Sequence, residues 1–289
     1  MSASTDGLPF SKLEALGNDF VVLDFRRGGG DPSPDQIQRL ADRHTGVGFD
    51  QLLILHPPRN DQADCRIEIY NADGSSARQC GNGMRAVALW LHQSDSGKHR
   101  FQFDTAAGAV TAQVEDRPAG DWRGENQRIV TVSMGQPDFS PAAAGLIAAE
   151  RLQQLAADLP GLLRLGTVSV GNPHLVLLLD RPASAARVER VGLKGGLQDC
   201  FADGVNISFA AITGPNRVKL AVFERGVGPT RACGSAACAT AAWLIEQAVV
   251  QTPVRIDQPG GTLVINWPGW DNALLMQGPA RRVFEGRLP

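Results

Sequence analysis

The chain contains two copies of one long sequence pattern, and this repetition limits the fold more than any other feature. When Cys80 is aligned with Cys233, the residues that follow match without gaps through Trp90 and Trp243. Upstream, the segment GNDF at 17–20 resembles GNPH at 171–174 at almost the same offset. Two long copies do not make a solenoid, which stacks many shorter repeats. The sequence therefore predicts a duplicated domain.

Two segments that follow Cys80 and Cys233 predict helices that are apolar on nearly every face. A helix of this kind must be buried on all sides. Most other segments are short, β-rich and bounded by Gly, Pro or Asp, which is typical of strands. A sheet that curves around each helix provides the burial. We expect an α+β fold of two pseudo-symmetric domains from an internal duplication, each a curved sheet or barrel around a buried central helix.

Loop-like sequence between residues 117 and 145 separates the two copies. We expect an N-terminal domain over residues 1–128 and a C-terminal domain over 129–276. The last strand, within 277–289, is a candidate to complete the first domain, which the sequence does not decide. Two outer helices are also expected, over 35–43 after Ser33-Pro34 and over 141–158 with Ser140 as the N-cap.

The composition excludes some classes of partner. The 289 residues include 28 Lys and Arg against 30 Asp and Glu, and this balance disfavours a nucleic-acid or anionic membrane partner. No apolar run reaches the roughly 18 residues of a membrane span. The first residues also lack the basic and apolar regions of a signal peptide. We therefore expect a cytoplasmic protein with reduced thiols.

Five cysteines, an odd number, make a disulfide scaffold improbable. There is no CxxC motif and no His at zinc-finger spacing, so no metal site is expected. Cys65 and Cys238 lie in apolar surroundings and are interpreted as small buried hydrophobic residues. The sequence around Cys200 is uninformative.

Cys80 and Cys233 each precede a glycine at the start of a buried helix. Free N–H groups and the helix dipole stabilise negative charge at this position. A thiol there can have its pKa lowered from about 8.5 to about 3.5–7.5, and the same N–H groups can hold a carboxylate. Duplication would place two thiols on opposite sides of one bound anion. This pattern favours a racemisation in which one thiolate removes a proton from Cα and the other thiol returns one to the opposite face.

Several longer motifs carry a family resemblance that runs nearly from end to end. They are LGNDF at 16–20, RHTGVGFDQLL at 43–53, YNADGSSARQCGNGMR at 70–85, GNPH at 171–174, GVNISF at 204–209 and ERGVGPTRACGSAAC at 224–238. With these motifs the chain resembles the diaminopimelate epimerases, pyridoxal-phosphate-independent enzymes of lysine and cell-wall biosynthesis. The resemblance implies a homodimer, no cofactor and diaminopimelate as the small-molecule substrate.

The resemblance also implies the roles of individual residues. Cys80 and Cys233 would be the acid–base pair: Cys233 takes the proton from the LL isomer and Cys80 returns one, with the roles reversed for the meso isomer. Backbone N–H groups would clamp the α-carboxylate, and His174 and Glu224 would modulate the pKa of the cysteines. The substrate-binding residues would be Asn18, Gln51, Asn71, Gly81, Asn82, Asn172, Asn206, Glu224, Arg225, Gly234 and Ser235.

These residue types suit a substrate with two carboxylates and two ammonium groups. Arg225 can grip the distal carboxylate with two hydrogen bonds, and Glu224 can meet an ammonium group. Structural roles are the alternative. The asparagines can be turn residues, Glu224 and Arg225 can form a surface pair, and His174 can be a core residue because its repeat-mate is Phe20.

Three other functions are compatible with paired cysteines. A proline or hydroxyproline racemase uses the same chemistry but needs no clamp for a distal carboxylate. A dithiol redox protein would link the two thiols reversibly, although CxxC is absent. A catalytically silent amino-acid-binding module would keep the pocket alone. The glycines at 28–30 are not followed by a Lys-Ser/Thr helix, so they do not predict a phosphate-binding loop.

Overall fold

The structure is a computed structural model that describes residues 7–94, 97–116, 126–193 and 196–288. It divides into two compact units. Unit 1 comprises residues 1–133 and 278–289, and unit 2 comprises residues 134–277. The end of the chain from residue 278 therefore belongs to unit 1. Among the helices in the described ranges, none is long and apolar enough to cross a membrane.

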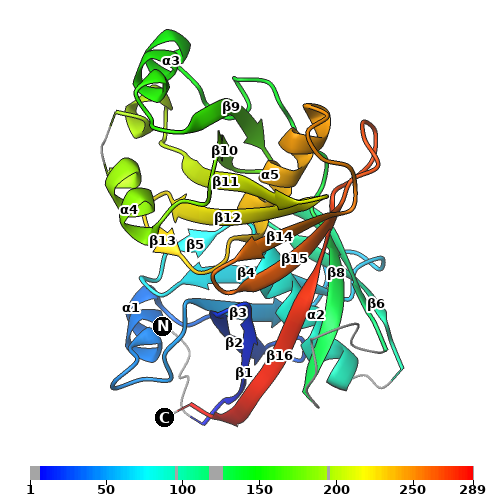
Figure 1. Ribbon diagram of the computed structural model, residues 1–289. Coiled ribbons are helices and arrows are strands. Elements are labelled where there is room, and N and C mark those ends of the chain that lie inside the picture. The colour runs from blue at the N-terminus through cyan, green and yellow to red at the C-terminus, as the bar shows by residue number, and fades with distance from the viewer. Residues whose placement is uncertain (1–6, 95–96, 117–125, 194–195, 289) are drawn as a thin grey trace. The chain divides into compact units, whose positions relative to one another are not determined.

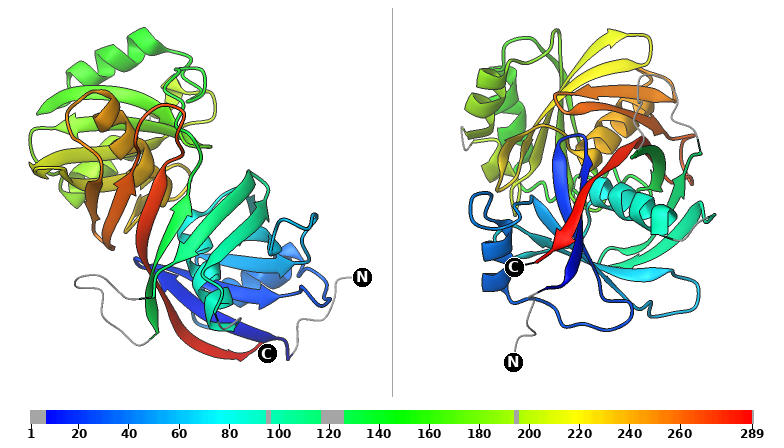
Figure 2. Two further views of the ribbon diagram at one scale, coloured as in Figure 1. Left: turned by 90° about the vertical axis from the view of Figure 1, so that its right-hand side faces the viewer. Right: turned by 90° about the horizontal axis from the view of Figure 1, so that it is seen from below.

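Unit 1 is a closed barrel built around a helix. Eight described strands are hydrogen-bonded side by side, and the last of them also pairs with the first (Figure 1). The central helix α2 (Gly81–Ser94) is buried over most of its length, as its apolar sequence requires, and Figure 2 shows it running inside the strands. The barrel strands are, in order, β1 (Pro9–Ala15), β2 (Asn18–Asp24), β3 (Gln51–His56), β4 (Cys65–Asn71), β6 (Arg100–Thr105), β7 (Gly108–Val114), β8 (Gln127–Ser133) and β16 (Leu275–Arg287).

Unit 2 repeats this plan around the helix α5 (Gly234–Glu246), which is also largely buried. Segment 134–138 lies between the first strand of the unit and the start of β16, because Asp138 pairs with Ser169 and the Met134 N–H donates to the Leu274 carbonyl. The strands are β9 (Leu162–Ser169), β10 (Pro173–Leu179), β11 (Asn206–Gly214), β12 (Arg217–Glu224), β14 (Val254–Gln258), β15 (Gly261–Asn266) and the first residues of β16.

The two units share their strand pairings, which confirms the predicted duplication. The pair β2–β3 is parallel and β3–β4 antiparallel, and the pairs β10–β11 and β11–β12 have the same directions. The short strands β5 (Ser76–Ala77) and β13 (Gly228–Thr230) pair with β4 and β12 in the same way. The register also corresponds, because Phe20 lies opposite Gln51 and His174 lies opposite Asn206. The α+β fold of two duplicated domains around central helices is thus the one expected.

The outer helices agree only in part with the sequence prediction. Helix α1 (Pro34–Ala41) starts after the N-cap Ser33 as expected, and α4 (Ala185–Leu193) was not predicted. The helix predicted over 141–158 is wrong in its first half, because α3 spans Ala149–Ala157. Residues 146–148 instead bond to another segment: the N–H groups of Ile147 and Ala148 both donate to the carbonyl of Cys200, in the short 3-10 helix η1 (Gln198–Cys200).

Candidate active site

Cys80 is half-buried and lies directly before α2 in unit 1. Its sulfur accepts a hydrogen bond from the Gly83 N–H at 3.2 Å, while its carbonyl accepts the first helical bond from Met84. The absence of a side chain at Gly83 permits this approach, since a Cβ there would lie 3.3 Å from the sulfur and 3.2 Å from Leu53. The helix start therefore directs N–H groups at the Cys80 sulfur, as expected for a site that stabilises negative charge.

Four predicted amide residues of unit 1 form two pairs near strand ends and the start of α2. Gln51 donates to the Asn71 side-chain oxygen at 2.9 Å, across neighbouring strands. Asn82 donates to the Asn18 oxygen at 3.4 Å, and Asn18 donates to Asp50 at 2.9 Å. The amides retain further donor and acceptor capacity for a zwitterionic ligand.

A charged network behind Asn18 was missed by the sequence interpretation. Asp50 accepts the Asn18 amide and the Asp19 N–H, and Arg43 bridges Asp19 and Asp50. Burial alone would raise the pKa of Asp19, but hydrogen bonds from Arg43 and Lys12 hold it well below its usual value. The Asp50 carboxylate thus fixes the side chain of Asn18, and Arg43 joins that carboxylate to Asp19. The motif RHTGVGFD contains Arg43 and Asp50, so the signal was present but unassigned.

Cys233 is the N-cap of α5 in unit 2, and it is more buried than Cys80. Its N–H donates to the Gln258 side-chain oxygen at 2.8 Å, and its sulfur lies 3.4 Å from the Ser235 hydroxyl. Burial raises the pKa of the Cys233 thiol well above its ordinary value, and the nearby Glu224 charge raises it further. The expectation of a lowered pKa at this helix start is therefore wrong for Cys233, because desolvation outweighs the helix N–H groups.

Glu224 is the charged neighbour of Cys233. It is half-buried, accepts a hydrogen bond from the Thr230 hydroxyl at 2.5 Å, and its contact with Cys233 includes a hydrogen bond. Because the thiol is protonated, the S–H group is the donor and the carboxylate the acceptor. The pair can therefore exchange a proton without solvent.

His174 is linked to Cys233 by a chain of hydrogen bonds. Its Nε2 donates to the Asn172 oxygen at 3.0 Å, and Asn172 donates to the Ser235 hydroxyl at 3.2 Å. Burial, together with the charge of Arg225, lowers the pKa of His174 to about 3. The imidazole is therefore neutral at physiological pH, and the hydrogen bonds of the described residues connect it to Cys233 through Asn172 and Ser235.

The Asn206 side chain links two backbone segments, at Pro173 and at Arg225. The Asn206 amide donates to the Pro173 carbonyl at 3.0 Å, and its oxygen accepts the Arg225 N–H at 3.0 Å. The exposed Arg225 guanidinium donates to the Asp203 carbonyl at 2.9 Å and keeps further N–H groups for a ligand. Among the predicted residues of unit 2, Glu224 and Ser235 contact Cys233, and Gly234 and Ser235 form the first turn of α5.

The two half-sites differ at the residues that surround each cysteine. The repeat offset places His174 over Phe20, Glu224 over Asn71 and Gln258 over Thr105. Gln258 is buried, and its side-chain nitrogen has no hydrogen-bond partner among the described residues. Sequence reasoning missed Gln258, although its mismatch with Thr105 in the repeat was a usable signal. His174 and Glu224 thus give unit 2 two ionisable side chains where unit 1 has Phe20 and Asn71.

Cys65 and Cys238 fit the interpretation as buried hydrophobic residues, and Cys200, for which the sequence offered no interpretation, is buried as well. Cys65, Cys200 and Cys238 are fully buried, and burial raises the pKa of Cys65 to about 12. Neutral, inert thiols are the expected result in such surroundings.

Alkylation with iodoacetamide should reveal the raised pKa of Cys233. Only the thiolate reacts, so we expect slow modification near neutral pH and about a tenfold faster rate per pH unit while the thiol is mostly protonated. Glu224→Gln removes the nearby negative charge and should accelerate modification of Cys233 near neutral pH. Peptide mass spectrometry resolves the sites, and the rate at Cys80 is the internal control. An unchanged Cys233 rate in the variant would contradict this electrostatic account.

Comparisons with known proteins agree on one family. The family model described as diaminopimelate epimerase matches residues 10–140 and 166–283. Proteins named diaminopimelate epimerase from Xanthomonas axonopodis pv. citri and Xanthomonas euvesicatoria pv. vesicatoria are 44% and 43% identical, each over 98% of both chains.

Solved structures show the same fold at much lower sequence identity. A protein from Pseudomonas aeruginosa described as a predicted epimerase has a TM-score of 0.71 at 17% identity, over 97% of this chain and 99% of its own. A hydroxyproline epimerase from Agrobacterium vitis has a TM-score of 0.66 at 16% identity, over 99% of this chain and 93% of its own.

Proposed function

Because the chain belongs to the diaminopimelate epimerase family, we propose that it is a cofactor-independent two-base epimerase that interconverts LL- and meso-diaminopimelate at one α-carbon. The observation that carries this proposal is the pair of cysteines at equivalent helix starts with different surroundings. Cys80 receives helix N–H donation, and Cys233 has a carboxylate that can accept its proton.

The first N–H groups of α2 and α5 suit the α-carboxylate of the substrate. The first N–H groups of a helix have no partner within it, and they attract anions. In the proposal, those of Gly81 and Asn82 in unit 1 and of Gly234 and Ser235 in unit 2 bind this carboxylate. They also stabilise the negative charge that develops on it as Cα loses its proton.

The proposed proton transfers start from the protonated Cys233 thiol. With the LL isomer, Glu224 accepts the proton of the Cys233 thiol, and the resulting thiolate removes the α-proton. Cys80 then donates its S–H proton to the opposite face of the carbanion and becomes a thiolate stabilised by the Gly83 N–H. The meso isomer reverses the two roles, as microscopic reversibility requires.

In the proposal, the remaining polar residues bind the charged groups of the substrate, including those at its distal end. Arg225 can bind the distal carboxylate through guanidinium N–H groups that the Asp203 carbonyl does not use. The Asn18, Gln51, Asn71 and Asn172 amides can bind the amino and carboxylate groups. The fixed Asn206 positions the Arg225 backbone. This set favours a long, doubly charged substrate over proline. In the proposal, the reaction belongs to lysine and peptidoglycan biosynthesis. A homodimer remains a prediction.

Proton NMR in D₂O tests the proposal directly. Reduced enzyme is incubated with LL-diaminopimelate, and we expect loss of the α-proton signal together with formation of the meso isomer. Proline and hydroxyproline are assayed in parallel, and reduction of a disulfide substrate tests the redox alternative. Exchange on proline but not on diaminopimelate would replace the proposal with a proline-racemase function. Disulfide reduction without exchange on any amino acid would favour a redox protein.

Glu224→Gln should slow epimerisation by about 10²-fold, at the lower end of what a positioned acid or base contributes. The glutamine preserves shape and hydrogen bonding but cannot accept the thiol proton. The ratio of wild-type to variant kcat should decrease as the pH rises, because solvent then deprotonates the Cys233 thiol. The measurement is kcat against pH for both proteins, with Glu246→Gln, on the far end of α5, as the control. A loss that is independent of pH would indicate a role in substrate binding alone.

A further inference from the structure

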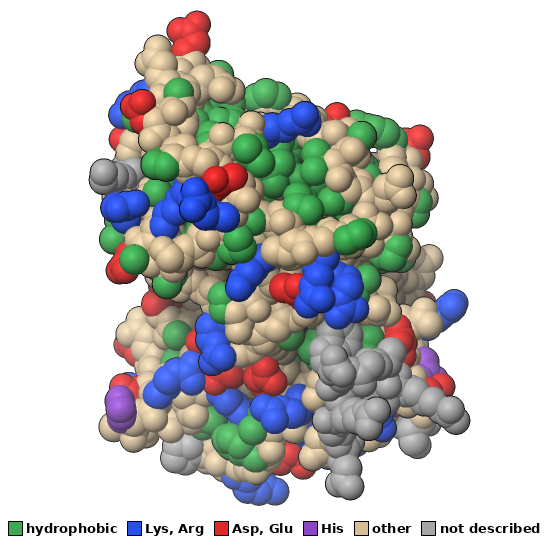
Figure 3. Space-filling model, viewed as in Figure 1, with side chains coloured by type: hydrophobic (Ala, Val, Ile, Leu, Met, Phe, Trp, Pro, Cys, Tyr) green, Lys and Arg blue, Asp and Glu red, His purple; other side chains and the backbone are tan. Residues whose placement is uncertain are grey.

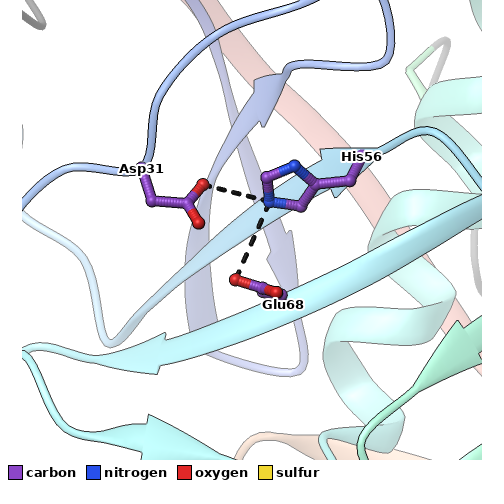
Figure 4. Close-up of side chains that lie close together, drawn as sticks. All are labelled: Asp31, His56 and Glu68. Carbon is purple, nitrogen blue, oxygen red and sulfur yellow. Dashed lines mark ion pairs between the residues drawn. The ribbon is translucent and has the colours of Figure 1, made fainter. Parts of the chain in front are cut away.

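A cluster of three ionisable side chains lies in unit 1 around His56. His56 is the last residue of β3, and Gln51 is the first residue of the same strand. The Nε2 atom of His56 is 3.0 Å from an Asp31 carboxylate oxygen and 3.7 Å from a Glu68 carboxylate oxygen. Figure 4 shows the two carboxylates approaching the same ring nitrogen from different segments. One ligand atom from each residue lies within 4.8 Å of the other two. These separations bracket the roughly 3.3 Å expected between ligands at zinc bond lengths of about 2.0–2.1 Å.

The nitrogen at the centre of the cluster is buried without a regular hydrogen bond. His56 is 8% exposed, and its Nε2 atom has no hydrogen-bond partner of regular geometry among the described residues, despite its ion-pair distance to Asp31. An unsatisfied buried polar atom is costly. A histidine binds a metal ion through a neutral ring nitrogen, and the buried Nε2 atom of His56 faces both carboxylates.

Neighbouring side chains hold the Glu68 carboxylate in place. The Tyr70 hydroxyl donates to the oxygen that faces His56 at 2.9 Å, and Arg66 bonds the other oxygen. Such outer contacts orient a ligating carboxylate and raise metal affinity. Glu68, Arg66 and Tyr70 also line a pocket of about 270 Å³, so one side of the cluster borders a cavity.

We propose that Asp31, His56 and Glu68 form a binding site for one divalent transition-metal ion of the Zn²⁺ or Co²⁺ type. One imidazole and two carboxylates suit such ions, and water completes the coordination. The ligands come from the loop before α1, from β3 and from β4. The ion therefore joins three segments of unit 1, and its effect is on stability rather than on the proton transfers at Cys80 and Cys233.

A cobalt titration tests this site with a readout other than activity. Co²⁺ is added to reduced, metal-free protein, and the visible d–d absorption is followed. We expect one ion per chain, no near-ultraviolet charge-transfer band of the kind that thiolate ligands give, and a higher melting temperature with Zn²⁺. Asp31→Asn and His56→Gln should each weaken binding at least about tenfold. Asp31 is exposed, so its variant should fold even if a change at His56 disturbs the core.

A separate pair of histidines, His92 and His99, supplies the matched control. The rings of His92 and His99 lie 4.7 Å apart and could bind cobalt adventitiously. His92→Asn should leave the affinity unchanged. Binding that persists in Asp31→Asn and His56→Gln, that disappears in His92→Asn, or that shows the thiolate band would overturn the proposal. So would the absence of any binding to the wild-type protein.

Discussion

Cys233→Ala should lower the rate of epimerisation at least about 10³-fold while the protein stays folded. The proposed mechanism gives this thiol the only position from which the α-proton of the LL isomer is removed, and a positioned acid or base contributes about 10²–10⁴-fold. The side chain occupies the N-cap of α5 without a capping hydrogen bond from its sulfur, so its removal costs little helix stability. The measurement is α-proton exchange and meso formation by NMR in D₂O.

Two further variants make this result specific. Cys238→Ala, on the same helix and fully buried, controls for loss of a thiol from α5 and should keep most of the activity. Cys80→Ala should also stop formation of the meso isomer. It should still allow deuterium to enter the LL isomer, because Cys233 can remove and return a proton on its own face. If Cys233→Ala exchanged the LL α-proton at the wild-type rate, a two-base mechanism with these roles would be wrong.

His174→Phe should make the protein markedly more resistant to mild acid. The folded state holds the pKa of His174 at about 3, whereas the unfolded value is 6.5. The unfolded chain therefore binds the proton first, and the stability from the neutral imidazole is lost as the pH falls from about 6.5 towards about 3. At about pH 4 the loss amounts to about 3 kcal/mol. Phenylalanine cannot take up a proton, so this part of the pH dependence should disappear.

The repeat itself suggests this substitution, because Phe20 occupies the equivalent position in unit 1. Urea unfolding near neutral pH and near pH 4 gives the change in unfolding free energy for each protein. Comparing each protein with itself cancels any packing cost of the larger ring. His44→Phe, at an exposed site, is the control and should retain the wild-type acid sensitivity. Equal acid sensitivity in wild type and His174→Phe would contradict the burial of a neutral imidazole.

The different surroundings of the two cysteines explain how one duplicated fold performs two roles. The residues around Cys233 include the buried His174, the carboxylate of Glu224 and Gln258. In the repeat these align with the neutral residues Phe20, Asn71 and Thr105 of unit 1. Burial and the nearby negative charge of Glu224 raise the pKa of the Cys233 thiol, and in the proposed mechanism the same carboxylate accepts its proton. An internal duplication therefore provides two equivalent helix starts, and substitutions around one of them make the pair unequal.

The sequence by itself determined the duplicated fold and the positions of Cys80 and Cys233 at the starts of the two central helices. Both follow from local patterns: helices apolar on all faces need a surrounding sheet, and a repeat without gaps preserves strand order. The sequence-based helix prediction failed for residues 141–148, because helix propensity predicted a helix that began before the actual start of α3 at Ala149. The backbone there bonds to Cys200, more than fifty residues away in sequence, and tertiary hydrogen bonds override local propensity.

Only the tertiary structure decided the direction of the Cys233 pKa shift and the positions of Asp50, Gln258 and the Asp31–His56–Glu68 cluster. The pKa of a thiol depends on the balance between helix N–H groups, burial and nearby charge, and sequence spacing shows the first of these alone. The cluster joins a loop and two strands whose separation along the chain resembles no metal-binding motif. Local patterns set which elements form, whereas desolvation and contacts between distant segments set what each side chain can do.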